Sequence, residues 1–182
     1  MPLRPLTPIA IDTALWPGGM RLALSAYATG HQPPLDLVSS VRCIVSVDNQ
    51  VLVCEDRHPS VDVLPGGRCE PGESWTQTAQ REVLEETGWH VDPATLSSLG
   101  FIHFLHLTPV ADDHPFPNPD FFQIVLCGKG HGAPESWVDV EGWVLRSWLV
   151  PVTEALNLPI SACGRPSCRC CEGSRYSNRK RR

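Results

Sequence analysis

Three glutamates near the middle of the chain have the residue type and spacing best suited to chemistry. Glu82, Glu85 and Glu86 stand at positions i, i+3 and i+4 of the segment REVLEETG. On an α-helix, which turns by about 100° per residue, their side chains fall within an arc of roughly 100°. Carboxylates that converge from one face and leave space for water and phosphate are typical of magnesium sites. The same spacing is also typical of an ordinary solvated helix face.

The place of these glutamates on their helix favours a bound cation. Ser74 and Gln77 match a capping box, and Gly88 supplies a C-terminal stop, so the sequence predicts a helix over about 75–87. All three glutamates then lie in the last two turns. There the negative end of the helix dipole and repulsion between like charges at i, i+4 both disfavour them. Divalent cations would remove this conflict.

Two further charged residues belong with the helix. Arg81 can pair with Glu85 one turn later, and Glu73, just before the helix, can fold back toward the same guanidinium. A fork-shaped cation between two carboxylates would fix their orientation and leave other carboxylates for metal. An ordinary intrahelical ion pair of little energetic value fits the spacing equally well.

The residues from Gly67 to Trp89 resemble a known signature, the Nudix box. Gly67, five residues, Glu73, seven residues and then REVLEETGW match every fixed position, with Trp89 in place of the usual aliphatic residue. The chain is therefore similar to Nudix hydrolases, over about residues 38 to 160. The resemblance implies an α/β fold, a Nudix-like α/β/α sandwich with a mixed β-sheet.

The resemblance also implies a reaction: hydrolysis of a diphosphate linkage in a nucleoside diphosphate derivative, by water attacking phosphorus. Such an enzyme is a pyrophosphohydrolase acting on phosphoric anhydrides. By resemblance Glu82, Glu85 and Glu86 are metal ligands and catalytic residues, and Gly67 offers its main-chain oxygen to the metal. The expected cofactor is Mg²⁺, with Mn²⁺ as an alternative. Arg81 joins the predicted catalytic set in an orienting role.

Two assignments stay open at this stage. The general base is either Glu85 or Glu86, because coupled carboxylates around cations share their titration. Many family members add an acid from a loop after the box. Glu141, five residues before Arg146, is the predicted extra metal ligand, with Glu135 as second choice; an ordinary exposed loop acid fits both positions as well.

The remaining pattern predicts the elements around the helix. Strands are expected at 38–47, 51–55, 98–107, 121–127 and 143–149, and a short helix is expected from about 152. The predicted organisation is an irregular N-terminal arm over 1–36, in which RLALSAYA is the one candidate for a strand or helix, a Nudix hydrolase domain over 37–160, and a Cys/Arg-rich, disordered tail over 161–182.

The substrate is not specified by the motif. The loop 109–120, rich in Pro and Asp, is expected to shape the pocket. Phe104, Phe121 and Trp89 are candidates for stacking on a base, although residues of this type are more often core. His103 and His106 fall on opposite faces of a predicted strand and form no pair.

Composition and charge exclude several classes of protein. The chain has 182 residues, 42% hydrophobic and 19% charged, which argues against a disordered or fibrous protein. It has no apolar run long enough for a membrane span. No secretory signal is recognised, and the cysteines outside the tail lie mostly in apolar segments, so reduced thiols and a cytoplasmic location are expected.

The net charge of −5 divides unevenly along the chain. From residue 163 onward seven Lys or Arg stand against Glu172, which gives +6 and leaves −11 for the body. An acidic body that binds an anionic substrate needs cations, and only Lys129 and Lys180 are lysines, so Arg must supply most phosphate contacts.

The expected partner is a small-molecule nucleoside diphosphate derivative, with no membrane and no nucleic acid. A homodimer is an expectation of the family that the sequence neither supports nor opposes. Two other functions are weighed. A non-hydrolytic nucleotide-binding sensor on the same fold is one, although such sensors usually lose box carboxylates. A zinc or nucleic-acid module built on the tail is the other, although the spacing of the tail cysteines lacks paired knuckles.

Overall fold

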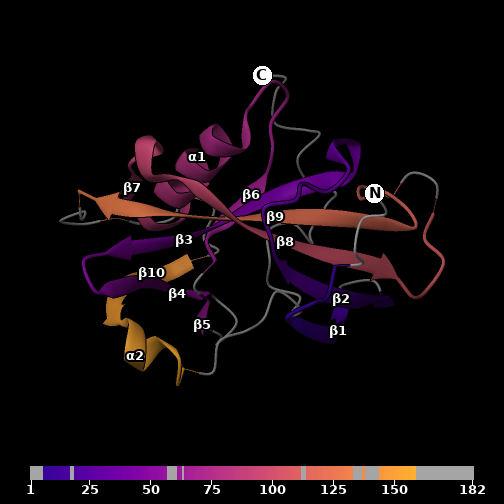
Figure 1. The fold of residues 1–182 in the computed structure, drawn as a ribbon, viewed down its shortest axis with the longest axis horizontal. Coiled ribbons are helices and arrows are strands. Elements are labelled where there is room, and N and C mark those ends of the chain that lie inside the picture. Colours follow the sequence, from indigo (N-terminus) through magenta and orange to yellow (C-terminus); the bar gives the residue numbers. More distant parts are fainter. Residues whose placement is uncertain are drawn as a thin grey trace.

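The computed structural model describes residues 6–16, 19–56, 61–62, 64–111, 114–132, 137 and 144–158. Its elements build one curled sheet flanked by helices (Figure 1). The strands are β1 (Ala10–Trp16), β2 (Met20–Ala28), β3 (Val38–Val47), β4 (Gln50–Asp56), β5 (Val61–Asp62), β6 (Gly66–Arg68), β7 (His90–Val91), β8 (Ser97–His106), β9 (Asp120–His131) and β10 (Val144–Pro151). The helices are α1 (Trp75–Thr87) and α2 (Val152–Ala155), with 3-10 turns at Leu35–Leu37 and Pro93–Thr95.

The sheet is mixed, as predicted. Its main order is β1-β2-β8-β9-β3-β4-β10, and three short strands pair beside this path: β5 with β4, β6 with β3, and β7 with β9. β3 and β9 run parallel, whereas the other pairs are antiparallel. The predicted α/β class is therefore confirmed.

The two helices lie on opposite sides of the sheet (Figure 1). Along β3, Val41 and Cys43 face the cluster beneath α1, whereas Ile44 packs with the cluster that includes Ala155 of α2. Successive residues of a strand point to opposite faces, so this alternation separates the two layers. The second helical layer of the described chain is only the short α2, which packs against β4 and β10.

The best predicted elements are those with strong local signals. β3 and α1 have the bounds expected from the sequence, and β4 follows β3 through a turn in which Asp48 takes a φ of 52°. β9 covers the strand predicted at 121–127, β8 and β10 overlap those predicted at 98–107 and 143–149, and α2 begins at 152.

The prediction of an irregular N-terminal arm over 1–36 is wrong across β1, whereas β2 coincides with RLALSAYA, the one segment of the arm for which a strand or helix was considered. β1 and β2 pair along their whole lengths, from Ala10–Ala26 to Trp16–Met20, and β2 continues the sheet onto β8. The reason is a period-two pattern hidden among prolines and glycines: Leu22 and Leu24 are buried, as are Met20 and Trp16. This arm therefore forms one edge of the main sheet.

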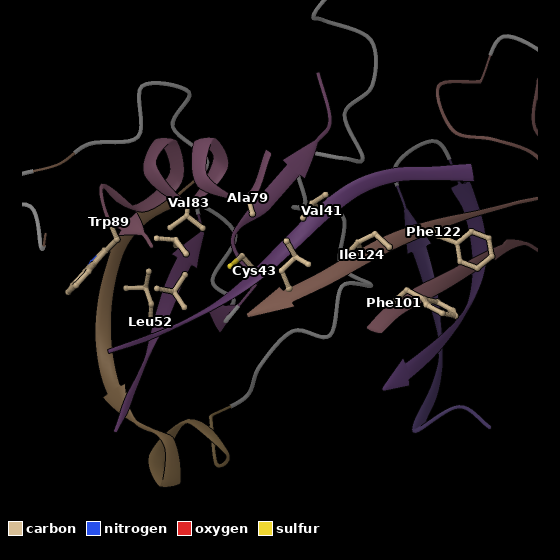
Figure 2. Packing of buried hydrophobic residues seen from close by; sticks show 12 residues of the cluster. Val41, Cys43, Leu52, Ala79, Val83, Trp89, Phe101, Phe122 and Ile124 are labelled. Carbon is tan, nitrogen blue, oxygen red and sulfur yellow. The ribbon is translucent and has the colours of Figure 1, made fainter. Parts of the chain in front are cut away.

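The main core lies between α1 and the sheet. Figure 2 shows Ala79 and Val83 on the side of α1 that faces Val41, Cys43 and Leu52. A second cluster, on the opposite face of the far half of the sheet, gathers Trp16, Phe104, Phe116 and Phe121 with aliphatic residues of β1 and β2. The first cluster fixes the face of α1 that carries no catalytic candidates.

Some predictions lie outside the described residues. They are Glu141, the second candidate Glu135, and the Cys/Arg-rich tail 161–182. Within the described part of the chain, neither helix has the length and apolar character that a membrane crossing requires.

Candidate active site

The carboxylate helix is fixed at both ends by its own sequence. The Ser74 hydroxyl accepts a hydrogen bond from the Gln77 N–H at 3.3 Å, and the Gln77 side chain accepts one from the Ser74 N–H at 2.9 Å. At the other end Gly88 takes the left-handed conformation, with φ of 72°, and its N–H donates to the Leu84 carbonyl. Both cap predictions are confirmed, and they set the rotation at which the glutamates emerge.

The three glutamates occupy different environments on α1. Glu82 and Glu86 are buried, with exposed fractions of 3% and 6%, whereas the Glu85 side chain is 45% exposed. Val83 packs into the core, but Leu84 stays 39% exposed, because the next residue along a helix points about 100° away. Burying carboxylates is costly unless they are compensated, so neighbouring groups must stabilise these two.

Arg81 connects four acidic and carbonyl partners. Its Nη1 donates to Glu82 at 2.7 Å and to Glu85 at 3.2 Å, and its Nη2 donates to the main-chain carbonyl of Arg68 at 3.0 Å. Two further bonds run to Glu73, from Nε at 2.7 Å and from Nη2 at 2.9 Å. The predicted pairing of Arg81 with Glu73 and Glu85 is present in the structure, and Glu82 joins it.

Glu73 is a carboxylate whose charged form is strongly stabilised by Arg81. The hydrogen bond from Arg81 lowers its pKa from 4.5 to about 2, against the opposing effect of burial, with help from the Glu70 N–H and the Thr78 hydroxyl. In turn Glu73 and Glu82 raise the pKa of Arg81. Both groups are therefore charged across the physiological range, so the ion pair of Glu73 and Arg81 persists at neutral pH.

Two glycines bring β6 against the helix. A Cβ on Gly67 would lie 2.4 Å from a carboxylate oxygen of Glu82, so only glycine leaves room for that side chain. The N–H of Gly66 donates to Glu86 at 2.9 Å. Glu82 and Glu86 of α1 therefore meet Gly66 and Gly67 of β6 in one polar contact region, called the seam below. Gly67, predicted as a main-chain metal ligand, lies beside Glu82 within it.

The donor chemistry of the seam fits a hard divalent cation. Glu73, Glu82, Glu85 and Glu86 carry four formal negative charges against one positive charge on Arg81, and the space that a Cβ would fill at Gly67 is taken by a carboxylate. Within the described ranges, no three or more His, Cys, Asp or Glu side chains converge as a ready metal cluster. Arg81 Nη1 instead bridges Glu82 and Glu85.

The family model of the NUDIX domain matches residues 36–167 of the chain. The chain belongs to the Nudix family. It is similar to YjhB of Bacillus subtilis, provisionally described as an ADP-ribose pyrophosphatase, with 26% identity over 158 residues, covering 83% of this chain and 65% of that protein. The chain spans less than two thirds of the length of each curated relative it matches.

Solved structures support the same fold. A Bacillus subtilis pyrophosphohydrolase is similar with a TM-score of 0.56 and 20% identity, covering 84% of this chain and 86% of that chain. A MutT protein from Bacillus halodurans is similar with a TM-score of 0.50 and 26% identity, covering 68% of this chain and 74% of that one. The curled mixed sheet is thus a Nudix fold.

The aromatic candidates from the sequence are core residues of this Nudix fold. Phe104 and Phe121 are fully buried and stack on each other at 4.8 Å, and Trp89 packs beneath α1. His103 contacts Asp120 at 2.9 Å on one face of the sheet, while His106 contacts His114 and Phe121 on the other, so they form no pair.

Sequence reasoning missed one contact beside the Nudix seam. The guanidinium carbon of Arg68 lies 4.7 Å from the ring centroid of Phe116. Arg68 is the residue after Gly67, and Phe116 belongs to the loop between β8 and β9. Only the PFP sequence around Phe116 hinted at a special loop, and nothing in it named the partner.

Proposed function

We propose that this chain is a Mg²⁺-dependent pyrophosphohydrolase that hydrolyses a diphosphate linkage in a nucleoside diphosphate derivative. The observation that carries the proposal is the seam between α1 and β6. There Glu82 and Glu86 are buried and Glu85 is half-exposed at the unfavourable end of one helix, and the Arg81 guanidinium donates to Glu82 and Glu85. Such placement is costly for folding alone and favourable around divalent cations.

The residues that would hold the metal are Glu82, Glu85, Glu86 and the main-chain oxygen of Gly67, with Glu141 as a further ligand. When bound, Mg²⁺ neutralises the diphosphate and lowers the pKa of a coordinated water, which makes water a nucleophile near neutral pH. Mn²⁺ supplies the same chemistry as an alternative.

The chain's own residues orient the carboxylates and handle the proton. Arg81, which is bound by Glu73, donates to one oxygen of Glu82 and to one oxygen of Glu85. These hydrogen bonds fix the orientation of both carboxylates, and the second oxygen of each would be used for the metal or the water. Glu85 is the more exposed of the two candidate bases and can pass a proton to solvent, whereas Glu86 is buried against the Gly66 N–H. We infer that Glu85 is the general base and that Glu86 binds metal.

The test is a panel of nucleoside diphosphate derivatives, with ADP-ribose included because of the name given to the Bacillus relative, incubated with Mg²⁺ and then with EDTA. We expect at least one compound to be cleaved at the diphosphate, and EDTA to abolish the cleavage. Glu85→Gln/Glu86→Gln should lose more than about 1000-fold in kcat, while Glu154→Gln, a control on exposed α2, should keep it. Unchanged turnover in the double variant would overturn the proposal.

The same panel separates the enzyme from a non-hydrolytic sensor. A sensor would bind one of the compounds tightly, by isothermal titration calorimetry, and release it intact. The complete carboxylate set favours turnover, because recognition of a nucleotide does not require every box acid.

We also propose a cytoplasmic location and a homodimeric assembly. Cys43, Cys54, Cys69 and Cys127 form no disulfide in the described chain, which supports a reducing, cytoplasmic setting. Non-reducing mass analysis and light scattering would test the thiols and a homodimer directly.

A further inference from the structure

His90 and His131 lie directly opposite each other on β7 and β9, which pair antiparallel. Both residues are exposed, and the centroids of their imidazole rings are 5.6 Å apart, with the ring planes 16° apart. Residues that oppose each other on neighbouring antiparallel strands have Cβ atoms about 4.5–5.5 Å apart and leave the sheet on the same face. The chain therefore places two imidazoles side by side on its surface.

The distance between the two rings suits a shared metal ion. Imidazole nitrogens bind Zn²⁺ at about 2.0–2.1 Å, which places the centroids of two imidazoles on one ion roughly 4.5–6 Å apart. The observed separation of 5.6 Å lies within this span, so rotation of each ring about its side-chain bonds can direct one nitrogen of each toward a common point. Imidazole is a good ligand for Zn²⁺, Cu²⁺ and Ni²⁺, whereas Mg²⁺ prefers oxygen. The chemistry of this pair therefore differs from that of the seam.

The main chain that carries the two histidines is fixed on both strands. Val91, the neighbour of His90, is buried, and the Asp92 N–H donates to the Lys129 carbonyl at 2.9 Å. The side chain of Gln80 donates to the Val91 carbonyl at 3.3 Å, which ties β7 to α1, and Figure 1 shows β7 beside this helix. Ligands whose main chain is already in place lose less freedom when an ion binds.

The ring nitrogens of this pair differ from those of other histidines. Three further histidines of the described chain use a ring nitrogen in a hydrogen bond: His31 with Thr29, His103 with Asp120, and His114 with Phe116. Within the described ranges, His90 and His131 make no hydrogen bond or ion pair through their rings, and the contact between them is one of stacking. An imidazole lone pair without a proton donor can bind a metal.

We propose that His90 and His131 form a binding site for a divalent transition metal ion of the Zn²⁺, Ni²⁺ and Cu²⁺ class, with water completing the coordination. This site goes beyond the proposed function, because it uses none of the box carboxylates. An ion there would join β7 to β9 just after Gly88, the C-cap of α1. It would thereby stabilise the end of the helix that carries Glu85 and Glu86. Two protein ligands, rather than the three or four of most zinc sites, give moderate affinity.

The experiment follows the histidine ring protons by NMR while the full chain is titrated with Ni²⁺ in excess Mg²⁺. Bound Ni²⁺ is paramagnetic and broadens nearby protons, so the readout locates the ion even where thiols or carboxylates elsewhere bind some of it. We expect the resonances of His90 and His131 to broaden together, at a lower Ni²⁺ concentration than those of the other histidines. In His90→Gln and in His131→Gln, the remaining ring should need at least about ten-fold more Ni²⁺, because its partner no longer supplies a second ligand at high effective concentration.

His31→Gln is the matched control, because His31 is also exposed but lies outside the β7–β9 ladder. It should leave the Ni²⁺ response of His90 and His131 unchanged. Thermal unfolding gives a second readout: Ni²⁺ should raise the melting temperature of wild type and of His31→Gln by more than it raises that of His90→Gln or His131→Gln.

Two results overturn this proposal. One is broadening of all histidines at the same Ni²⁺ concentration, which would mean an adventitious ion only. The other is a His131 response in His90→Gln that stays within about two-fold of wild type. The wild-type titration decides the first result by itself, even if a variant does not fold. Failure of wild type to cleave any compound would instead reject the proposed function and would leave this metal site standing.

Discussion

Glu73 holds Arg81 by two parallel hydrogen bonds, Nε to Oε1 at 2.7 Å and Nη2 to Oε2 at 2.9 Å. This fork-to-fork contact joins the loop before α1 to the middle of the helix. The remaining nitrogen, Nη1, then reaches Glu82 and Glu85. A planar guanidinium fixed on one edge has little freedom on the other, so Glu73 orients two carboxylates that it does not touch.

Replacing Glu73 with Gln should reduce stability in a pH-dependent way. The pKa of Glu73 is about 2 in the folded chain against 4.5 ordinarily, because Arg81 favours its charged form. A lowered pKa contributes stability that is fully present above 4.5 and is lost as the pH falls through about 2. At one pKa unit per about 1.4 kcal/mol, the loss at pH 7 is about 3 kcal/mol at most.

Urea unfolding at several pH values between 7 and 3 measures this loss. The difference between wild type and Glu73→Gln should be largest at pH 7 and shrink at pH 3. Glu70→Gln, an exposed neighbour on the same loop, should follow wild type. A constant difference at every pH would contradict the role of the Glu73 charge.

Replacing Gly67 with Ala should disable the site through a steric effect. The added Cβ would meet the Glu82 carboxylate at 2.4 Å, and that carboxylate is held by Arg81. We expect kcat/KM to fall at least about ten-fold and the Mg²⁺ concentration for half-activity to rise. Gly30→Ala is the control, because nothing lies within 4 Å of its Cβ position. Normal activity in Gly67→Ala would show that Glu82 has room to move.

The sequence predicted those parts of the site that a single helix can place. The caps at Ser74 and Gly88 set the bounds of α1, and local periodicity then put three glutamates on one arc. The ion pair of Glu73 with Arg81 could also be predicted, because Glu73 lies only eight residues before Arg81.

Features that depend on distant contacts were not predicted. The contact of Arg68 with Phe116 joins β6 to the loop between β8 and β9, which is far away in the chain, and no local pattern encodes it. β1 was missed, and β2 was left open between strand and helix, because prolines and glycines between short apolar alternations suggested an irregular arm. Their strand character comes from pairing with each other and with β8, which is a tertiary effect.

Glu86→Gln should separate the metal role from the folding role of this residue. Gln keeps an oxygen that can accept the Gly66 N–H, so the bond at 2.9 Å is retained while the buried charge is removed. In EDTA we expect a melting temperature equal to or above that of wild type, because repulsion at the end of α1 is reduced. With Mg²⁺, wild type should gain several degrees and the variant less than about half of that gain. Glu154→Gln should gain as much as wild type. An equal gain in Glu86→Gln would exclude it as a metal ligand.

Ser74→Ala should destabilise the chain by about 1 kcal/mol, which is the usual value of a helix N-cap. The Ser74 hydroxyl accepts the Gln77 N–H, and this bond anchors the helix start next to Glu73. Urea unfolding measures the change, and Ser74→Asp, which also caps helices, should recover most of the stability. A loss in Ser74→Asp as large as in Ser74→Ala would mean that the cap contributes little.

Cys43 should resist alkylation until the chain unfolds. Burial, with a smaller contribution from Cys127, raises the pKa of the Cys43 thiol to about 12, and its side chain is fully buried beneath α1. Since the thiolate is the nucleophile, the reactive fraction at pH 8 is on the order of one in ten thousand. Iodoacetamide labelling followed by peptide mass analysis should modify Cys43 in urea but scarcely in buffer, whereas the partly exposed Cys127 should label in both. Rapid labelling of native Cys43 would mean that α1 and the sheet separate readily beneath the candidate active site.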